Sequence, residues 1–322
     1  MHKIYDEWPK IARNSYEMQL PELDFSGINH IVFAGMGGSG ALGDIFEAIL
    51  SKTNLHVSVI KGYLLPKTTD SKTLVVTTSV SGNTVETLNV LNCAKNQNCK
   101  IIAFSSGGKM ETTCLKNNIP FQKISKIHSP RASFPSFLYS MIKVLNPIIF
   151  VKSTDIFESL DLLEKQRKKI FSGNMDGRNP AIELAEWING IPMVYYPWGL
   201  QAAAIHFKNS FQENAKLHIM TEDVIEACHN GIVSWEKKST VQPILLEGKD
   251  DYFKTQERWR ILKEYFKKNN IQYQEIKSVN GSILSKLINL IYFLDYVSIY
   301  KAILTKTDPS PVNSIDFIKR RL

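Results

Sequence analysis

Cysteine is scarce in this sequence. Among 322 residues there are four cysteines, and their spacing matches no metal-ligand pattern. Four are also too few for the disulfide framework that stabilises small secreted domains. We therefore expect no metal centre and a cytoplasmic location, where thiols stay reduced. The four residues are Cys93, Cys99, Cys114 and Cys228.

A long uninterrupted apolar segment is also missing. A membrane-spanning helix needs about 18–20 consecutive apolar residues, and the nearest candidate, residues 137–151, is interrupted by Lys143 and Pro147. The opening residues 1–7 carry acidic side chains and no apolar core, unlike a signal peptide. We expect no membrane association.

Basic residues are not gathered into one patch. Lys and Arg number 39 against 31 Asp and Glu, which gives a net charge of +8. The short basic clusters at residues 165–169 and 319–321 have no interleaved aromatic side chains of the kind that stack on nucleic-acid bases. We expect no nucleic-acid partner, because a pocket for a phosphorylated metabolite explains a positive charge equally well.

The length exceeds that of one hydrophobic core and favours two domains. We place their boundary at 152/153, where the chain becomes polar and charged, which gives domains 1–152 and 153–322. Short apolar strands alternate with helical patterns in both halves, which is typical of an α/β fold with parallel sheets covered on both faces. The strands are expected at residues 31–34, 56–60, 74–78, 100–104 and 120–123, and then at 192–196, 241–246 and 271–275.

A hydroxyl-rich turn follows the predicted strand 74–78. It contains Ser79, Ser81 and Thr84, and an amphipathic helix pattern begins at Val85. Free N–H groups and the helix dipole attract an anion at such a strand-to-helix turn, so the segment is a candidate phosphate site. The alternative is an ordinary helix N-cap, for which Ser and Thr are also preferred.

A glycine-rich turn, GMGGSG at residues 35–40, follows the first predicted strand. Its G-x-G-x-x-G spacing matches a dinucleotide fingerprint, but Lys61 lies about where the ribose-binding acid should follow. The alternative is that bare backbone at Gly37 and Gly38 admits a small ligand, which Ser39 hydrogen-bonds. Both turns follow strand ends, where ligands of parallel sheets bind.

Three further side chains are candidates for chemistry. Arg131 lies in a loop before a predicted helix, and Glu213 and His229 lie in or near irregular chain. A carboxylate and an imidazole can form an acid/base pair, with Glu213 taking a carbon-bound proton and His229 moving protons on oxygen. The alternatives are a structural arginine and solvated loop residues.

Several of these motifs occur together and in order: GMGGSG at 35–40, SVSGNTVET at 79–87, SPRA at 129–132, ENAK at 213–216 and EACHN at 226–230. With the closing DP at 308–309 and KRRL at 319–322, this pattern resembles the bifunctional phosphoglucose/phosphomannose isomerase family, built from two sugar isomerase (SIS) domains. The resemblance implies two three-layer α/β/α domains, each with a mainly parallel five-stranded sheet.

The resemblance also implies an activity. Family members interconvert glucose 6-phosphate or mannose 6-phosphate with fructose 6-phosphate through a cis-enediolate, without metal or cofactor. It implies that the first domain binds the phosphate and that the second carries the base and the ring-opening histidine. The residues implied to bind substrate are Gly37, Gly38, Ser39, Ser79, Ser81 and Thr84.

The implied catalytic roles are specific. Glu213 would shuttle the proton between C1 and C2, Arg131 would stabilise the enediolate, and His229 would open the sugar ring from the partner subunit of a homodimer. The family's active-site lysine aligns with Tyr300, next to Lys301, so either residue could face the site. A non-catalytic sugar-phosphate-binding regulator with the same fold is the rival reading.

Overall fold

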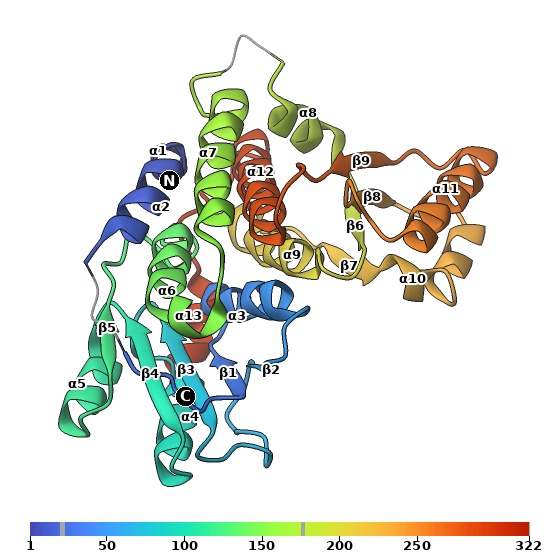
Figure 1. Cartoon of the computed structure of the whole chain (residues 1–322). Coiled ribbons are helices and arrows are strands. Elements are labelled where there is room, and N and C mark those ends of the chain that lie inside the picture. Colours follow the sequence, from blue (N-terminus) through green and yellow to red (C-terminus); the bar gives the residue numbers. More distant parts are fainter. Residues whose placement is uncertain (20–22, 175–177, 322) are drawn as a thin grey trace. The chain divides into compact units, whose positions relative to one another are not determined.

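The computed structural model describes residues 1–19, 23–174 and 178–321 (Figure 1). The chain divides into two compact units, each considered by itself. The first holds Met1, Lys3–Ser153 and Asn313–Leu322, and the second holds His2 and Thr154–Val312. The main division thus falls one residue after the predicted boundary at 152/153, but residues 313–322 group with the first unit instead of the second.

The first unit contains a five-stranded parallel sheet in the order β2-β1-β3-β4-β5, as expected (Figure 1). The central strands β1 and β3 are buried along their whole length, which suits their apolar and β-branched residues. The bounds are β1 His30–Ala34, β2 His56–Ile60, β3 Thr73–Ser79, β4 Lys100–Ser105 and β5 Phe121–Lys123.

Helices cover both faces of this sheet (Figure 1). On one face Phe33 of β1 stacks on Phe46 of α3 with ring centroids 4.8 Å apart. On the other face Val75 of β3 packs with Val90 and Ala94 of α4. The helices are α1 His2–Asp6, α2 Trp8–Glu17, α3 Gly38–Leu50, α4 Val85–Asn96, α5 Gly108–Lys116, α6 Phe134–Ile149 and, near the end of the chain, α13 Asn313–Lys319.

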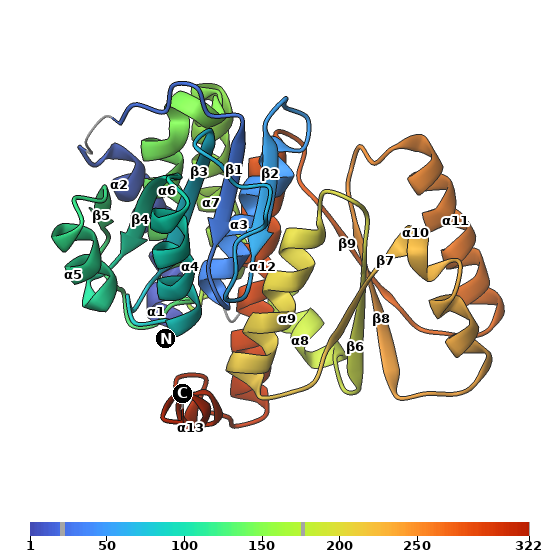
Figure 2. The ribbon, with the colours of Figure 1, turned by 90° about the horizontal axis from the view of Figure 1, so that it is seen from below.

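The second unit contains a four-stranded parallel sheet in the order β7-β6-β8-β9 (Figure 2). The expectation of five strands is therefore wrong for the described part of this unit. After β9 the described chain continues into α12 and then through residues 305–312 into α13, so no further strand follows β9 among the described residues. The bounds are β6 Ile191–Tyr196, β7 Met220–Asp223, β8 Val241–Glu247 and β9 Gln274–Lys277.

The helices of the second unit also lie on both faces of its sheet (Figure 2). Tyr195 and Leu245 share one core with Trp259 and Phe266 of α11. On the other face, α9 and α8 pack against the long helix α12. The helices are α7 Ser153–Ile170, α8 Pro180–Trp187, α9 Gln201–Ala215, α10 Val224–Ala227, the 3₁₀ helix η1 Gly231–Glu236, α11 Phe253–Lys268 and α12 Ile283–Leu304.

Among the described helices, α12 alone is long and apolar enough to cross a membrane. However, 83% of its most apolar 18-residue window is buried inside the protein. Its packing against α8 and α9 explains the apolar composition, so α12 is the core helix of the second unit.

His30 at the start of β1 makes stability depend on pH. Its ring stacks on that of His56 with centroids 4.3 Å apart, and it is 4% exposed. Burial, together with the charge of His56, lowers the pKa of His30 below its ordinary value of 6.5. Between the lowered pKa and 6.5 the unfolded chain binds more protons than the folded one, so stability falls as pH drops through that window.

We expect the midpoint of thermal unfolding to decrease from pH 7.5 to pH 5.5, and to decrease less in a His30→Asn variant. His218→Asn is the matched control, because His218 is exposed in the second unit. A pH dependence in His30→Asn equal to that of the wild type would contradict this assignment.

Candidate active site

The loops that follow β1, β3 and β4 meet at the carboxyl edge of the first sheet. The strand register aligns Ala34 with Thr77 and Ser79 with Ser105, so neighbouring strands end at similar levels. Ligands of parallel α/β sheets bind beyond this edge. The candidate substrate residues of the first unit lie in these loops or at the strand and helix ends that border them.

The β3–α4 loop forms the centre of this edge. The hydroxyls of Ser79 and Thr84 lie 2.8 Å apart, and the Gly82 N–H donates to Ser79 Oγ at 3.1 Å. The Asn83 N–H donates to Ser81 Oγ at 3.2 Å.

Thr84 is the N-cap residue of α4, yet its side chain accepts no capping hydrogen bond from the first turn. The ordinary N-cap alternative is therefore not what the structure shows. The first-turn N–H groups and the positive end of the helix dipole are left for an anion.

The β4–α5 loop braces this turn from the side. The Ser106 hydroxyl donates to the Val80 carbonyl at 2.6 Å, and the Met110 N–H donates to the Gly82 carbonyl at 2.9 Å. A Cβ on Gly82 would lie 1.7 Å from the Gly107 carbonyl oxygen, so only glycine fits there. Sequence reasoning missed this loop, although Gly107 and Gly108 follow the predicted strand 100–104 after two serines and repeat the strand–glycine–helix signal of the first turn.

The glycine-rich β1–α3 loop contacts the β3–α4 loop directly. The Val80 N–H donates to Ser39 Oγ at 3.4 Å. Gly37 has a φ of +55°, which favours glycine, and a Cβ on Gly38 would lie 3.9 Å from the main chain of Pro130 and Arg131. Bare backbone at Gly38 therefore lies beside the loop that carries Arg131.

Arg131 is 4% exposed in the loop before α6. The hydroxyl of Ser133 fixes that loop by donating to the Ser129 carbonyl at 2.8 Å and accepting from the Ile127 N–H at 2.8 Å. A guanidinium stays protonated at any ordinary pH. The structure thus gathers the six candidate substrate residues and the main chain of Arg131 at one edge of the first unit.

Glu213 and His229 belong to the second unit and lie apart in it. Glu213 is half-buried in the last turn of α9, where the Lys216 ammonium donates to its main-chain carbonyl. His229 follows α10 and is exposed. Its main-chain N–H donates to the main-chain carbonyl of Glu226 at 2.8 Å.

Strand β7 separates these two residues. Helix α9 ends where β7 begins, whereas α10 follows the carboxyl end of the same strand (Figure 2). At about 3.3 Å per residue, this four-residue strand spans roughly 13 Å. Glu213 and His229 therefore lie toward opposite edges of the second sheet.

Lys301 and Tyr300 both make bonds within the second unit. The Lys301 ammonium donates to the carbonyl of Ile188, the C-cap residue of α8, and burial lowers its pKa below the ordinary 10.5. The Tyr300 hydroxyl donates to the Ile170 carbonyl at 2.7 Å and accepts from Asn179 Nδ2 at 3.2 Å. These bonds secure the ends of α7 and α8, and a catalytic role for Lys301 stays a prediction.

The loop of the second unit that corresponds to the β3–α4 loop, the candidate phosphate cradle of the first unit, has different chemistry. After β8, the carboxylate of Asp251 accepts from the Gly248 N–H at 3.0 Å and from Trp259 Nε1 at 2.9 Å. Burial raises the pKa of Asp251 above its ordinary value. Since the loop already binds its own carboxylate, the cradle of the first unit is not repeated here.

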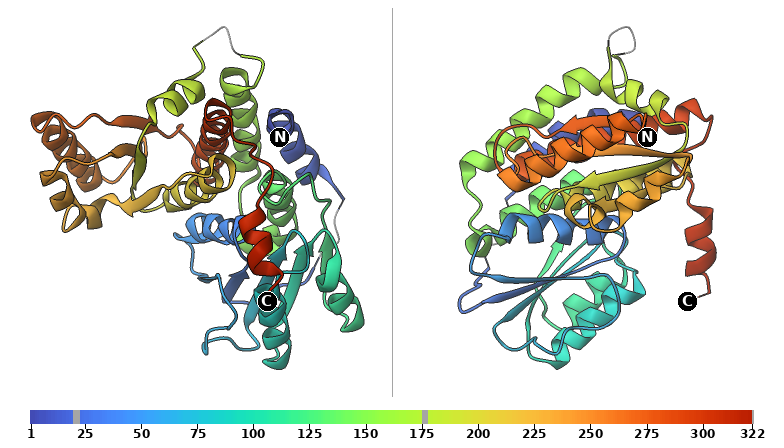
Figure 3. Two further views of the ribbon diagram at one scale, coloured as in Figure 1. Left: turned by 180° about the vertical axis from the view of Figure 1, so that it is seen from behind. Right: turned by 90° about the vertical axis from the view of Figure 1, so that its right-hand side faces the viewer.

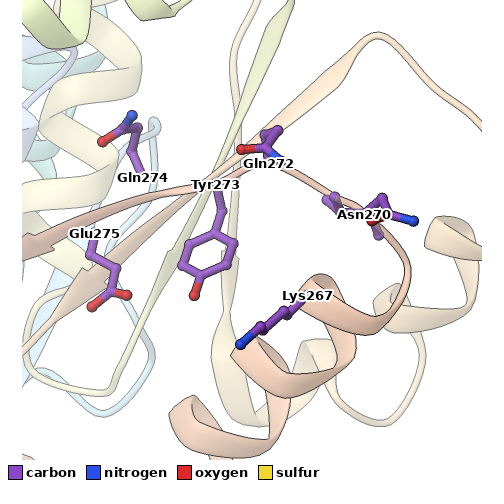
Figure 4. A pocket seen from close by; sticks show the side chains of 7 residues that line it. Lys267, Asn270, Gln272, Tyr273, Gln274 and Glu275 are labelled. Atoms are coloured by element: carbon purple, nitrogen blue, oxygen red, sulfur yellow. The ribbon is translucent and has the colours of Figure 1, made fainter.

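An open pocket of about 580 Å³ lies between the end of α11 and the start of β9 (Figure 4). Lys267 and Tyr273 extend toward each other across it (Figure 4). Because it lies where β9 starts, it is at the edge of the sheet opposite the one where ligands bind in this fold class. Its lining is Lys267, Asn270, Ile271, Gln272, Tyr273, Gln274 and Glu275.

Comparison with known proteins defines the class first. Residues 24–139 match the SIS domain family, and residues 177–322 match the family described as the bacterial phospho-glucose isomerase C-terminal SIS domain. A solved structure, the C-terminal domain of glucosamine-fructose-6-phosphate aminotransferase from Francisella tularensis, shares the fold with a TM-score of 0.75 at 17% identity, covering 96% of this chain and 97% of that one. The chain is a protein of two SIS domains.

Two curated relatives give a narrower assignment. The chain is 32% identical to a bifunctional phosphoglucose/phosphomannose isomerase of Caldicellulosiruptor bescii, over 92% of this chain and 90% of the relative. It is 28% identical to one of Aquifex aeolicus, over 96% and 95% of the two chains. The chain belongs to the bifunctional phosphoglucose/phosphomannose isomerase family.

Gly82 gives a direct test of the braced cradle. With φ at +67° and no room for a Cβ, a Gly82→Ala variant should lose about 1–3 kcal/mol of stability and should bind hexose 6-phosphate more weakly. Gly62→Ala is the control, because a Cβ there meets nothing within 4 Å. Thermal unfolding and calorimetric titration measure the two effects, and wild-type values for Gly82→Ala would contradict the observed close contact.

Proposed function

We propose that this protein is an aldose–ketose isomerase that interconverts glucose 6-phosphate, mannose 6-phosphate or both with fructose 6-phosphate. The observation that carries the proposal is the anion cradle at the carboxyl edge of the first sheet. There Ser79, Ser81 and Thr84 lie in the turn that leads into α4, a helix whose N-terminus has no side-chain cap. Membership of the isomerase family supplies the reaction type.

In the proposed mechanism, the cradle binds the substrate phosphate and so orients the sugar. A phosphate held by amides and hydroxyls provides binding energy far from the reacting carbons, and that energy fixes C1 and C2 in place. Gly37, Gly38 and Ser39 line the sugar, because the backbone there is bare and lies beside the phosphate loop.

Proton transfer follows ring opening. Glu213 removes the proton from C2 of the open-chain aldose, and the electrons of that C–H bond form the enediolate with negative charge on oxygen. Arg131 stabilises this charge, since a buried guanidinium is a fixed cation. A proton then passes from the C2 hydroxyl to the C1 oxygen, which leaves the negative charge on the C2 oxygen. Return of the proton from Glu213 to C1 now gives the ketose.

We propose that His229 opens the sugar ring from the partner subunit of a homodimer. The support is that Glu213 and His229 lie toward opposite edges of the second sheet. Exposed aromatic residues in the loops after β6 and β8 add support, because such side chains are enriched at protein interfaces. Trp198 is 78% exposed, Tyr252 66% and Phe253 60%.

The rival function is a sugar-phosphate-binding regulator without catalysis. One assay separates the two: the purified protein with fructose 6-phosphate and a chelator, with glucose 6-phosphate and mannose 6-phosphate measured separately. Product formation supports the isomerase, and tight binding without product supports the regulator. A cytoplasmic location is part of the proposal and is consistent with the four free cysteines.

A Glu213→Gln variant tests the base. We expect kcat to fall by about 10²–10⁴, because a general base typically contributes that much, with substrate binding retained. Glu186→Gln is the control, since Glu186 is an exposed carboxylate of the same unit. Wild-type turnover in Glu213→Gln would exclude the proposed role.

The double variant Ser81→Ala, Thr84→Ala tests the cradle. Loss of two hydroxyls that would bind the phosphate should raise KM by about tenfold or more, since a hydrogen bond to a charged group contributes roughly 1.5–3 kcal/mol. Thr112→Ala removes an exposed hydroxyl of α5 and serves as the control. An unchanged KM in the double variant would place the phosphate elsewhere.

A further inference from the structure

A continuous chain of buried polar groups crosses the interface between α9 and α12, which lie side by side in the second unit (Figure 3). His206 Nε2 lies 3.1 Å from both carboxylate oxygens of Asp295. Asn214 Nδ2 donates to Ser298 Oγ at 2.8 Å, and that hydroxyl donates to the Asp295 carbonyl at 2.6 Å. We call these four residues the α9–α12 network, and none is more than 2% exposed.

The composition of this interface needs an explanation. Apolar residues of similar size would fill the same space without the cost of desolvating a carboxylate and an amide. Most neighbouring positions of α12 are indeed apolar and buried, including Leu294 and Val297. What a hydrogen-bonded network adds is one defined register, because its bonds are lost if one helix slides or rotates against the other.

The network holds α9 at two points. His206 and Asn214 lie eight positions apart on one helix face, which corresponds to about 12 Å at 1.5 Å per residue. One hydrogen-bonded contact would allow α9 to rotate about that contact. Two contacts fix both the position of α9 along α12 and its rotation. The second contact, between Asn214 and Ser298, lies in the last turn of α9, where fraying is otherwise expected.

Glu213 is the residue directly before Asn214, in the helical turn that the Asn214–Ser298 hydrogen bond fixes. Adjacent helical residues differ by about 100° in direction, so the buried position of Asn214 fixes the direction in which the Glu213 side chain leaves the helix. On the other side, Lys216 ends the helix with a φ of +57° and donates to the Glu213 carbonyl. The main chain around Glu213 is therefore fixed on one side by Asn214 and on the other by Lys216.

We propose that the α9–α12 network is a positioning device that sets the direction of the Glu213 carboxylate toward the substrate carbons. The inference rests on the proposed role of Glu213 as the base. A base must lie within about 2.6–3.2 Å of the proton that it takes. A displacement of 1 Å can lower the rate by about 10².

Asn214→Ala and Ser298→Ala test the proposal, since each removes the same hydrogen bond from a different helix. We expect each variant to lower kcat by about 10² and to change KM little, because the phosphate cradle lies in the other unit. The double variant should show no further loss, as expected when two changes break one interaction.

An isotope measurement separates positioning from simple loss of stability. With glucose 6-phosphate deuterated at C2, slower proton transfer should raise the ratio of the hydrogen and deuterium rates in Asn214→Ala above the wild-type ratio. Leu262→Ala is the matched control: Leu262 belongs to the core on the other face of the sheet, so this variant loses stability without touching the network. It should keep the wild-type kcat and isotope ratio at temperatures where it is folded.

Failure of the positioning role can be distinguished from failure of the proposed function. An unchanged kcat, or a lower kcat with the wild-type isotope ratio, in Asn214→Ala overturns the positioning role and leaves the proposed function intact. Wild-type turnover in Glu213→Gln, or the absence of isomerisation by the wild-type protein, overturns the proposed function and this inference with it.

Discussion

The main-chain contact between Gly82 and Gly107 is the constraint on which the first unit's site depends. The absence of a Cβ at Gly82 lets two loops from neighbouring strands meet, and that contact fixes the backbone between Ser79 and Thr84. A turn held in this way is ordered without a ligand, and it leads into the uncapped first turn of α4. Ser39 extends the same rigid frame to the glycine-rich loop through the Val80 N–H.

The two units use one architecture for different purposes. Both have parallel sheets with helices on both faces, and both place loops at the carboxyl edge. In the first unit the central loop leaves a helix N-terminus uncapped, whereas in the second Asp251 supplies a carboxylate to the Gly248 amide. The same fold therefore carries different chemistry at the carboxyl edge of each sheet, because the difference resides in a few loop residues.

The sequence was informative where function needs residues that are close in the chain. The turns at 35–40 and 79–84 combine glycine and hydroxyl residues with apolar strands before them, so their location at the ends of strands was predictable. Strand β7 was not predicted, because its residues, Met220–Asp223, are mostly polar and it lies at the sheet edge with little burial. The expected fifth strand of the second sheet came from the resemblance, which carries a family's usual strand count, whereas the described chain forms no strand after β9.

By itself the sequence determined the α/β class, the two-part organisation and the family, since these follow from periodicity and from motifs that are local in the chain. Only the tertiary structure decided which separate segments meet: Ser39 with Val80, Gly82 with Gly107, and Asn214 with Ser298. It also separated Glu213 from His229 by the length of β7. The physical reason is that contacts between residues far apart in the chain depend on strand order, register and helix packing, which no local pattern encodes.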